Sequence, residues 1–394
     1  MKLRIKFAQS GAVPAGWAGR TREGEIIAKI NGTGVRLRAF RADDADALAA
    51  GFDDPLSRRF LPPLPSPYTV AHAERYIAEH VVATSGEGGA LYAIADPQTD
   101  ELLGGIGIDK VVPVRRQAEV GYWVGPWARR RGVATAALRA LTTHALGHGL
   151  DRLELLTHLD NPASQRVAMA AAFQREGLRR GAQPGRGGAR DDMVVFTRLA
   201  GDPDEPLPRL LPDLPGGELS DGVVRLRPLG PGDYDFLTEL LALPEVIATS
   251  VPPEPPSAER IRRRCDRAET QWLGGTRADL VIEDAVTGAP AGDIGLFYDD
   301  PFTQQAMIGY SMLPAYRGRG FPTRAAQLLS LWVFAETDVV RLIAGAAPGN
   351  RGSRRVLEKA GFHEEAYLRA RLPGPDGTRV DDVQYVLLAE DLLN

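Results

Sequence analysis

Two short segments rich in arginine and glycine carry the clearest chemical signal in this chain. Residues 129–135 read Arg-Arg-Arg-Gly-Val-Ala-Thr, and residues 317–323 read Arg-Gly-Arg-Gly-Phe-Pro-Thr. Each segment lies between a predicted strand and a predicted helix. Free backbone N–H groups and the positive end of a helix dipole make such a turn an anion site suited to phosphate. Neither segment is a P-loop or a dinucleotide fingerprint, because both lack the glycine and lysine spacing of those motifs.

The two turns belong to an internal repeat. The tetrapeptide Val-Arg-Leu-Arg occurs at residues 35–38 and 224–227, and the pattern Gln-Ala-x-x-Gly-Tyr occurs at 117–122 and 305–310. So long a period describes whole domains and not the units of a solenoid. The predicted organisation has four parts: an extension with a hairpin at 1–34, a domain at 35–200, a proline-rich linker at 201–221 and a domain at 222–394.

Each repeat predicts a mixed α/β domain around a central strand–turn–helix unit. Apolar residues recur at i+4 after the first turn, which predicts one buried helical stripe. In the first repeat we expect strands at 35–40, 91–95, 103–109, up to 124, 152–158 and 192–198, and helices at 43–51, 70–83, 132–146 and from 162. In the second we expect strands at 224–229, 278–283, 291–297, up to 312, 340–346 and 383–388, and helices at 231–243, 258–273, 320–336 and from 351.

Composition excludes several classes of protein. The chain has 394 residues and a formal net charge of −4, whereas a protein that coats nucleic acid should be basic. The single cysteine, Cys265, cannot form an intramolecular disulfide or a cysteine-built metal site, which fits a reducing, cytoplasmic compartment. No apolar run approaches the ~18 residues that span a bilayer, so we expect no membrane partner. His144 and His148 lack an evident third ligand, so we expect no metal site.

On these motifs the chain resembles the GNAT superfamily of acyl-CoA-dependent N-acetyltransferases. The family signature Gln/Arg-x-x-Gly-x-Gly/Ala is matched at 129–134, and at 317–322 except that Pro322 takes the last place. A second signature, typical of the branch of the ribosomal-protein N-terminal acetyltransferases RimJ and RimL, is Asn-x-x-Ser followed by a helix and Gly-Phe. Residues 350–362 match it, and residues 161–173 match it with Ala in place of Gly.

The resemblance implies two tandem domains, each with a twisted central mixed sheet flanked by helices. The fourth and fifth strands of each sheet splay apart, the pantetheine arm of acetyl-CoA lies in the gap, and its pyrophosphate lies on the turn. Ser164 and Ser353 would lie near the thiol. The residues implied to hold the cofactor are Arg129, Arg130, Arg131, Gly132, Val133, Ala134, Thr135, Asn161, Arg166, Arg317, Gly318, Arg319, Gly320, Phe321, Thr323 and Asn350.

The implied reaction is the attack of a neutral primary amine on the thioester. Glu119, on the strand before the first turn, is placed to act as general base, and the hydroxyl of Ser164 could help the thiolate to leave. Ser353 is the corresponding catalytic candidate in the second domain. The second repeat has Met307 where the first has Glu119, so we predict that the first domain is the catalyst. Three roles stay open for the second domain: weak binding of CoA, completion of the acceptor cleft, or catalysis with Asp299 or Asp300 as base.

Structural interpretations compete with these catalytic ones. Glu119 could pair with an arginine, Ser164 and Ser353 could cap the next helix, and Tyr122 and Tyr310 are expected to pack.

The acceptor and the assembly are less constrained by the sequence. The resemblance implies that the segment between the first two helices of each repeat, 52–68 and 243–257, shapes the acceptor site. Both segments are apolar and proline-rich, which favours a peptide N-terminus or a small natural-product amine over a polycation. A longer acyl-CoA donor and a non-catalytic CoA-binding or scaffold protein remain alternatives. We expect a monomer whose two domains form an internal pseudo-dimer.

Overall fold

The computed structural model describes residues 30–61, 64–80, 88–185 and 188–393, and the statements below concern these residues. The chain divides into two compact units, with the boundary between Leu207 and Pro208. This boundary lies inside the predicted linker. Leu211 and Leu214 are buried in the core of the second unit, so the later part of that linker belongs to the second unit.

The first unit contains one sheet of eight strands in the order β1-β2-β3-β4-β5-β6-β8-β7. All neighbouring strands are antiparallel except β5 and β6, so the predicted mixed sheet is confirmed. The elements in chain order are β1 (Ile30–Gly32), β2 (Val35–Arg38), α1 (Ala45–Asp53), α2 (Pro55–Phe60), α3 (Val70–Arg75), β3 (Ala90–Ala95), β4 (Leu102–Val112), β5 (Gln117–Val124), α5 (Val133–Gly147), β6 (Arg152–His158), α6 (Pro162–Ala170), β7 (Gln174–Pro184) and β8 (Arg190–Leu199).

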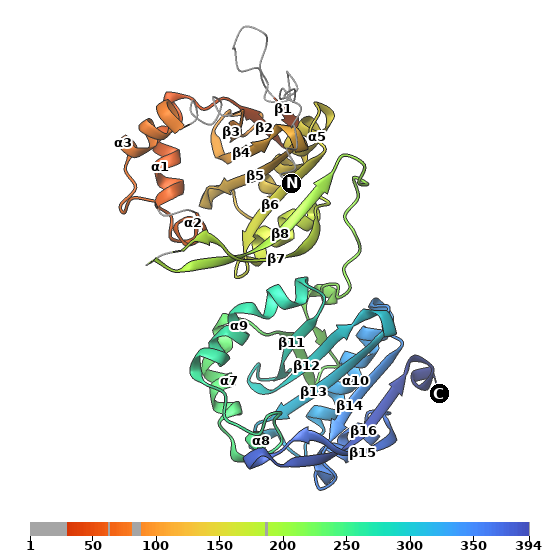
Figure 1. The fold of residues 1–394 in the computed structure, drawn as a ribbon. Coiled ribbons are helices and arrows are strands. Elements are labelled where there is room, and N and C mark those ends of the chain that lie inside the picture. The colour runs from red at the N-terminus through yellow and green to blue at the C-terminus, as the bar shows by residue number, and fades with distance from the viewer. Residues whose placement is uncertain (1–29, 62–63, 81–87, 186–187, 394) are drawn as a thin grey trace, which may run out of the picture. The chain divides into compact units, whose positions relative to one another are not determined.

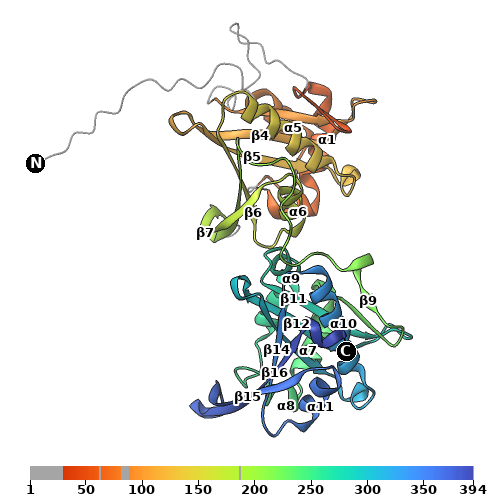
Figure 2. The ribbon, with the colours of Figure 1, turned by 90° about the vertical axis from the view of Figure 1, so that its right-hand side faces the viewer.

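Helices cover both faces of this sheet. On one face, α5 buries the predicted stripe Val133, Ala137, Leu141 and Ala145 against the strands. Figure 2 shows α5 crossing the face formed by β4 and β5. On the other face, α1 and α3 pack over a second apolar cluster that includes Trp123 of β5 (Figure 1). Consecutive residues of β5 therefore point alternately toward α5 and toward α1.

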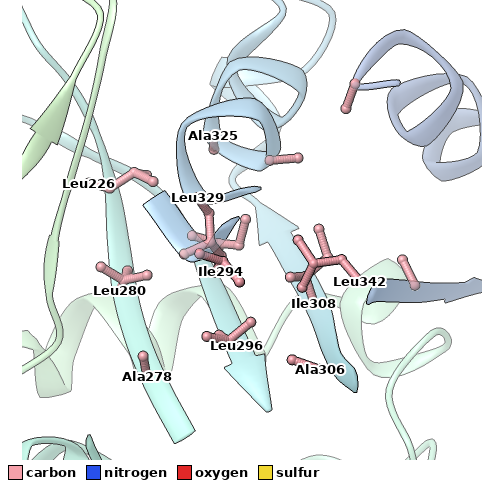
Figure 3. Close-up of a cluster of buried hydrophobic side chains, with 14 of the residues drawn as sticks. Leu226, Ala278, Leu280, Ile294, Leu296, Ala306, Ile308, Ala325, Leu329 and Leu342 are labelled. Carbon is pink, nitrogen blue, oxygen red and sulfur yellow. The ribbon is translucent and has the colours of Figure 1, made fainter. Parts of the chain in front are cut away.

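The second unit repeats this architecture with the sheet order β15-β16-β14-β13-β12-β11-β10-β9, in which only β13 and β14 are parallel. Its elements are β9 (Leu219–Ser220), β10 (Val224–Pro228), α7 (Tyr234–Leu241), α8 (Pro244–Ile247), α9 (Ala258–Leu273), β11 (Arg277–Asp284), β12 (Pro290–Asp300), β13 (Gln305–Met312), α10 (Phe321–Glu336), β14 (Arg341–Ala346), α11 (Arg351–Lys359), β15 (His363–Pro373) and β16 (Arg379–Leu388). Figure 3 shows Leu280, Ile294 and Ile308 of three neighbouring strands pointing toward Leu329 of α10.

Five of these helices and strands are not predicted by the sequence patterns: β7, β15, α2, α8 and β9, the last of which has only two residues. Strands β7 and β15 lie at the sheet edges and are mostly exposed, so they lack the apolar alternation by which strands are recognised. Helices α2 and α8 are short and lie within the proline-rich segments, where each begins with a proline at its first position. The helix expected at 70–83 runs as α3 to Arg75 and continues as a π-helical turn to His80; residues 81–87 are outside the described part of the chain.

The predicted hairpin before residue 35 is present in part. Strands β1 and β2 pair Ile30 with Leu37, and β1 forms the edge of the first sheet. Residues 25–29, which we expected in its first strand, are outside the described residues.

We predict that Leu329→Ala lowers the free energy of unfolding of the second unit by about 2–5 kcal/mol, because Leu329 is fully buried and its truncation leaves a cavity. Leu331→Ala on the same helix is the matched control. Its side chain is 53% exposed, and we expect a change within about 0.5 kcal/mol. Denaturant titration of both variants measures the difference, and equal losses would contradict the burial of this face of α10.

Candidate active site

The turn before α5 has the backbone of an anion site. Gly132 precedes the helix with a φ of +75°, and a Cβ atom there would meet nothing within 4 Å. The first helical bond runs from the N–H of Ala136 to the carbonyl of Gly132, so the N–H groups of the first turn are left for a ligand. Gly320 repeats this geometry before α10, with a φ of +80° and equally open space. There, Pro322 removes one donor from the first turn.

Val133 and Phe321, which the resemblance places in the cofactor site, have buried side chains. They are 6% and 2% exposed and belong to the two hydrophobic cores, so only their backbone N–H groups can face a ligand. Ala134, Thr135 and Thr323 are half-buried in the first helical turns.

The arginines of the two turns have different surroundings. Arg130 and Arg131 are exposed beside Gly132 in the first unit. In the second unit, Gly318 takes the place of Arg130, and Arg319 is bound by Asp284 at 3.3 Å and lies over the rings of Tyr316 and Phe321. The turn of the first unit therefore offers the freer cationic side chains among the described residues.

Arg129 and Arg317 are engaged away from the expected phosphate position. Arg129 donates to the carbonyl of Val124 and to the side chains of Asp54 and Ser57, at 3.2, 2.5 and 2.9 Å. Arg317 donates to the carbonyl of Met312 and to Glu245 of α8, at 2.8 and 2.6 Å. We expected both guanidinium groups to hold pyrophosphate; they instead fasten each turn to a strand end and to a short helix.

The splay between the central strands is present in both units. Strands β5 and β6 pair only from Gln117 to Glu119, although β5 continues to Val124. Strands β13 and β14 likewise pair only from Gln305 to Met307. Beyond these residues the two strands separate, which leaves one backbone edge of each strand open to a ligand chain. This gap has the position that the resemblance gives to pantetheine.

A tyrosine bridges each gap to the following helix. The hydroxyl of Tyr122 on β5 lies 2.9 Å from Ser164 Oγ on α6, and the hydroxyl of Tyr310 lies 2.9 Å from Ser353 Oγ on α11. Burial raises the pKa of Tyr122 well above its ordinary value and that of Tyr310 to about 12, so both keep their protons at neutral pH. Sequence analysis treated these tyrosines as packing residues, although the repeated Gly-Tyr pairs marked them.

The asparagines of the second signature act as helix caps. Asn161 Oδ1 accepts from the N–H of Ser164, and Asn350 Oδ1 accepts from the N–H of Ser353, both at 3.1 Å. We weighed Ser164 and Ser353 as caps; the cap is the asparagine, which leaves each serine hydroxyl beside its tyrosine. Arg166 lies half-buried on α6.

Glu119 lies on the face of β5 that points toward α1, at the start of the splay. Its Oε1 accepts from Lys110 Nζ at 2.7 Å, and its side chain is 17% exposed. Two residues further, Gly121 is exposed, and a Cβ atom there would meet nothing within 4 Å. A carboxylate therefore stands beside open space along the unpaired edge of β5.

Two further titratable residues share this face on the neighbouring strand. Glu154 pairs with Glu119 in register, but Arg152 and Arg179 hold its two oxygens at 3.0 and 2.9 Å. His158 ends β6 with its Nδ1 3.7 Å from Asp191 Oδ2 and its ring 5.6 Å from that of Phe60. Sequence analysis missed His158, because only the strand pairing places it on the face that carries Glu119.

Four matched positions on this face of the second unit are apolar, although the face also carries the buried Asp279 and Asp293, which are paired with arginines. Asp109, Glu119 and Glu154 of the first unit correspond in register to Phe297, Met307 and Ile343. Ala347 follows Ile343 by four residues, as His158 follows Glu154. The ring of Phe297 also lies 3.9 Å from where a Cβ atom of Gly309 would be, whereas the equivalent Gly121 is open. The second unit thus keeps the splay and the turn but has no titratable group at these four positions.

Asp299 and Asp300, the other bases considered for the second unit, are the last two residues of β12. Asp300 caps the turn after β12 by accepting from the N–H of Phe302, and Asp299 is exposed beside it. Among the described residues, no group of three His, Cys, Asp or Glu side chains could hold a metal ion. No helix in the described ranges combines the length and apolarity needed to cross a bilayer.

A family model for the acetyltransferase (GNAT) domain matches residues 35–174 and again residues 224–363. The chain belongs to this family. The two matches begin at the first residues of β2 and β10, one in each unit. Each unit is therefore one GNAT domain, and the predicted tandem arrangement is confirmed.

Relatives of known name share parts of the chain. A probable N-acetyltransferase, YjcK of Bacillus subtilis, is 47% identical over 66 residues, which are 17% of this chain and 36% of the relative. The ribosomal-protein-serine acetyltransferase of Escherichia coli is 34% identical over 101 residues, which are 25% of this chain and 56% of the relative. The chain thus spans about a third of the length of the first relative and about half of the length of the second. The crystal structure of a GNAT-family acetyltransferase from Bacillus anthracis matches 44% of this chain and 99% of its own, with 22% identity and a TM-score of 0.39.

We predict that Asn161→Ala lowers the free energy of unfolding by about 1 kcal/mol, because the first turn of α6 loses the acceptor for the N–H of Ser164. Asn161→Asp keeps a capping oxygen and is expected to stay within a few tenths of a kcal/mol of the wild type. Thermal or denaturant unfolding measures both. Equal destabilisation by the two substitutions would show that the amide nitrogen, and not the capping oxygen, matters at this position.

Proposed function

We propose that the protein is an N-acetyltransferase that transfers the acetyl group of acetyl-CoA to a primary amine in its first GNAT domain. The observation that carries the proposal is the contrast between matched faces: Glu119 beside the open Gly121 in one domain, and Met307 beside Phe297 in the other. The two domains share a fold but differ in the residue at this position of the sheet. This difference supports catalysis in the first domain and the lack of a general base at the matched position of the second.

The residues of the first domain fit the proposed cofactor. The N–H groups of the first turn of α5 face open space beside Gly132, which suits a pyrophosphate. The unpaired edge of β5 beyond Glu119 offers backbone hydrogen-bonding groups to the amides of a pantetheine arm. Arg130 and Arg131, both exposed, add positive charge at the same end. When bound, acetyl-CoA supplies the thioester carbonyl.

In the proposed mechanism, Glu119 takes a proton from the acceptor ammonium, and the free amine attacks the thioester carbonyl carbon. As the carbon–sulfur bond breaks, the thiolate takes a proton from the Tyr122–Ser164 hydroxyl pair, whose Oγ and Oη atoms lie 2.9 Å apart. The acylated nitrogen gives up its second proton, which restores the hydroxyl pair, and Glu119 releases the first proton to solvent. Lys110, the partner of Glu119, is itself 60% exposed, so in the proposed mechanism the acceptor ammonium takes its place beside the carboxylate. The bond that forms is carbon–nitrogen, and the overall reaction releases one proton.

The proposed acceptor is a peptide N-terminus or a small natural-product amine. At pH 7, deprotonating an α-amino group of pKa near 8 costs about 1.4 kcal/mol, whereas a lysine amine of pKa near 10.4 costs about 4.6 kcal/mol. The acceptor-side segment 52–68 is also apolar and proline-rich, and the rings of Phe52, Tyr68 and Trp123 pack in the core beneath it. The sparse charge of this segment favours an apolar group next to the amine over a polycation. Turnover restricted to polycationic amines would contradict this part of the proposal.

We predict that Glu119→Gln lowers kcat/KM by about 10²- to 10⁴-fold, because the amide cannot accept the amine proton, while affinity for acetyl-CoA stays within about twofold. Thiol release from acetyl-CoA, followed with a panel of N-terminal peptides and small amines, measures turnover. Met307→Gln is the matched control in the second domain and should leave turnover unchanged. A loss with Met307→Gln but not with Glu119→Gln would reverse the assignment of the catalytic domain.

We predict that Gly132→Trp abolishes binding at the first turn, because an indole there fills the open space and is strained at a φ of +75°. Calorimetric titration of the wild type, Gly132→Trp and Gly320→Trp with acetyl-CoA counts the sites. One site lost only with Gly132→Trp places the cofactor in the first domain alone. Two wild-type sites, one lost in each variant, would mean that the second domain also binds it, and no wild-type binding would overturn the proposal. Repeating the titration with butyryl- and octanoyl-CoA tests the alternative of a longer acyl donor.

A further inference from the structure

We propose that Arg129 is a positioning residue that clamps helix α2 to the cofactor turn and so couples cofactor binding to the acceptor side of the first domain. The inference rests on the proposed function, because it assumes that the turn before α5 receives acetyl-CoA. It differs from the role that the family signature suggests for this arginine, which is direct contact with the pyrophosphate.

The contacts of Arg129 join three elements. Its Nε donates to the carbonyl of Val124 at the end of β5, at 3.2 Å. Its NH2 group donates to Asp54 Oδ2 and to Ser57 Oγ, at 2.5 and 2.9 Å. Asp54 is the N-cap of α2, where it also accepts from the N–H of Ser57 at 2.9 Å. One guanidinium therefore holds the end of the central strand and the start of α2 together beside Gly132.

The clamp is a charged one. Burial alone would raise the pKa of Asp54, but the hydrogen bonds from Arg129 and from the Ser57 N–H lower it below its ordinary value. The carboxylate is thus ionised at neutral pH, and the pair is charge-assisted, which makes such bonds shorter and stronger than neutral ones. Ser57 is 8% exposed, so part of the contact is shielded from water.

The second domain supplies an independent example. Arg317 donates to the carbonyl of Met312 at the end of β13 and to Glu245 Oε1 on α8, at 2.8 and 2.6 Å. The acid differs in type and in place, since Asp54 is a cap and Glu245 lies inside the first turn of its helix. In both domains the arginine therefore connects the turn to a short helix, although the acid that it binds differs. This recurrence indicates that the arginine has a positioning role.

Helix α2 leads from the cofactor turn to the acceptor face. It begins after Asp54 and ends at Phe60, whose ring lies 5.6 Å from that of His158 at the end of β6. The six residues of α2, at 1.5 Å each, span about 9 Å. A displacement of the first turn of α2 would therefore also move Phe60 at its other end. Ordering of the turn by a ligand would then order the contact with His158, and the coupling would act equally in the reverse direction.

The test uses CoA as the probe and needs no acceptor. Calorimetry gives the affinity for CoA, and hydrogen–deuterium exchange gives the protection of the amides of residues 57–61. The variants are Arg129→Met, Asp54→Asn and the double variant. Asn keeps the helix cap but lacks the charge that pairs with Arg129, so Asp54→Asn tests the clamp even if Arg129→Met fails to fold. Glu259→Gln removes an exposed ion pair with Arg263 on α9 and is the control.

In the wild type and in Glu259→Gln we expect CoA to slow exchange in α2 by about fivefold or more, the low end of ordinary coupling free energies. In Arg129→Met and Asp54→Asn we expect CoA affinity within about threefold of the wild type, with the slowing of exchange lost. The double variant should show no further change, since both substitutions break one contact.

Two results would overturn the inference while leaving the proposed function in place. The first is a loss of CoA affinity of about tenfold or more in Arg129→Met but not in Asp54→Asn, which would make the guanidinium a phosphate ligand. The second is slowing of α2 exchange that persists in Asp54→Asn. Failure of the wild type to bind CoA would instead overturn the proposed function itself.

Discussion

The pairing of β5 with β6 ends after three residues, and the rest of each site depends on this interruption. A continuous parallel pair would use the backbone N–H and C=O groups of residues 120–124 inside the sheet. Because the pairing ends, those groups border a gap, the helix that follows β5 directs its first turn at one end of that gap, and Tyr122 reaches across to Ser164. The same interruption, turn and tyrosine occur in the second domain, so they are properties of the fold.

The two domains show that the scaffold and the chemistry are separable. The second turn keeps the backbone conformation of the first, with Gly320 at a φ of +80°, although Pro322 removes one of its N–H donors. The difference lies in a few matched positions on one face of each sheet, where the first domain has acids and a histidine and the second has apolar residues. A duplicated chain can thus keep the packing of its cores while the polar groups of one copy are replaced, because these side chains lie outside the buried clusters that α5 and α10 cover.

Much of the fold could be predicted from the sequence, because the central elements carry periodic apolar residues. Helix α9 was predicted with its observed bounds, and α5 and α10 within one residue. Edge strands β7 and β15 could not be predicted, since exposed strands carry no such period. The contacts of Arg129 could not be predicted either, because its partner Asp54 lies 75 residues away in the sequence and only the folded chain brings the two together. His158 joins the face of Glu119 only through strand register.

The gap between β5 and β6 also bears on how the protein avoids aggregation. An unpaired strand edge attracts strands of other molecules, and proteins commonly protect outer edges with charge, proline or a bulge. Here the unpaired edge lies in the interior of the sheet, with β6 and β8 on its far side. A second protein chain cannot approach it sideways, as it could approach β7, and would have to enter end-on between two strands. Strand order thus protects a backbone that must remain unpaired to hold a ligand.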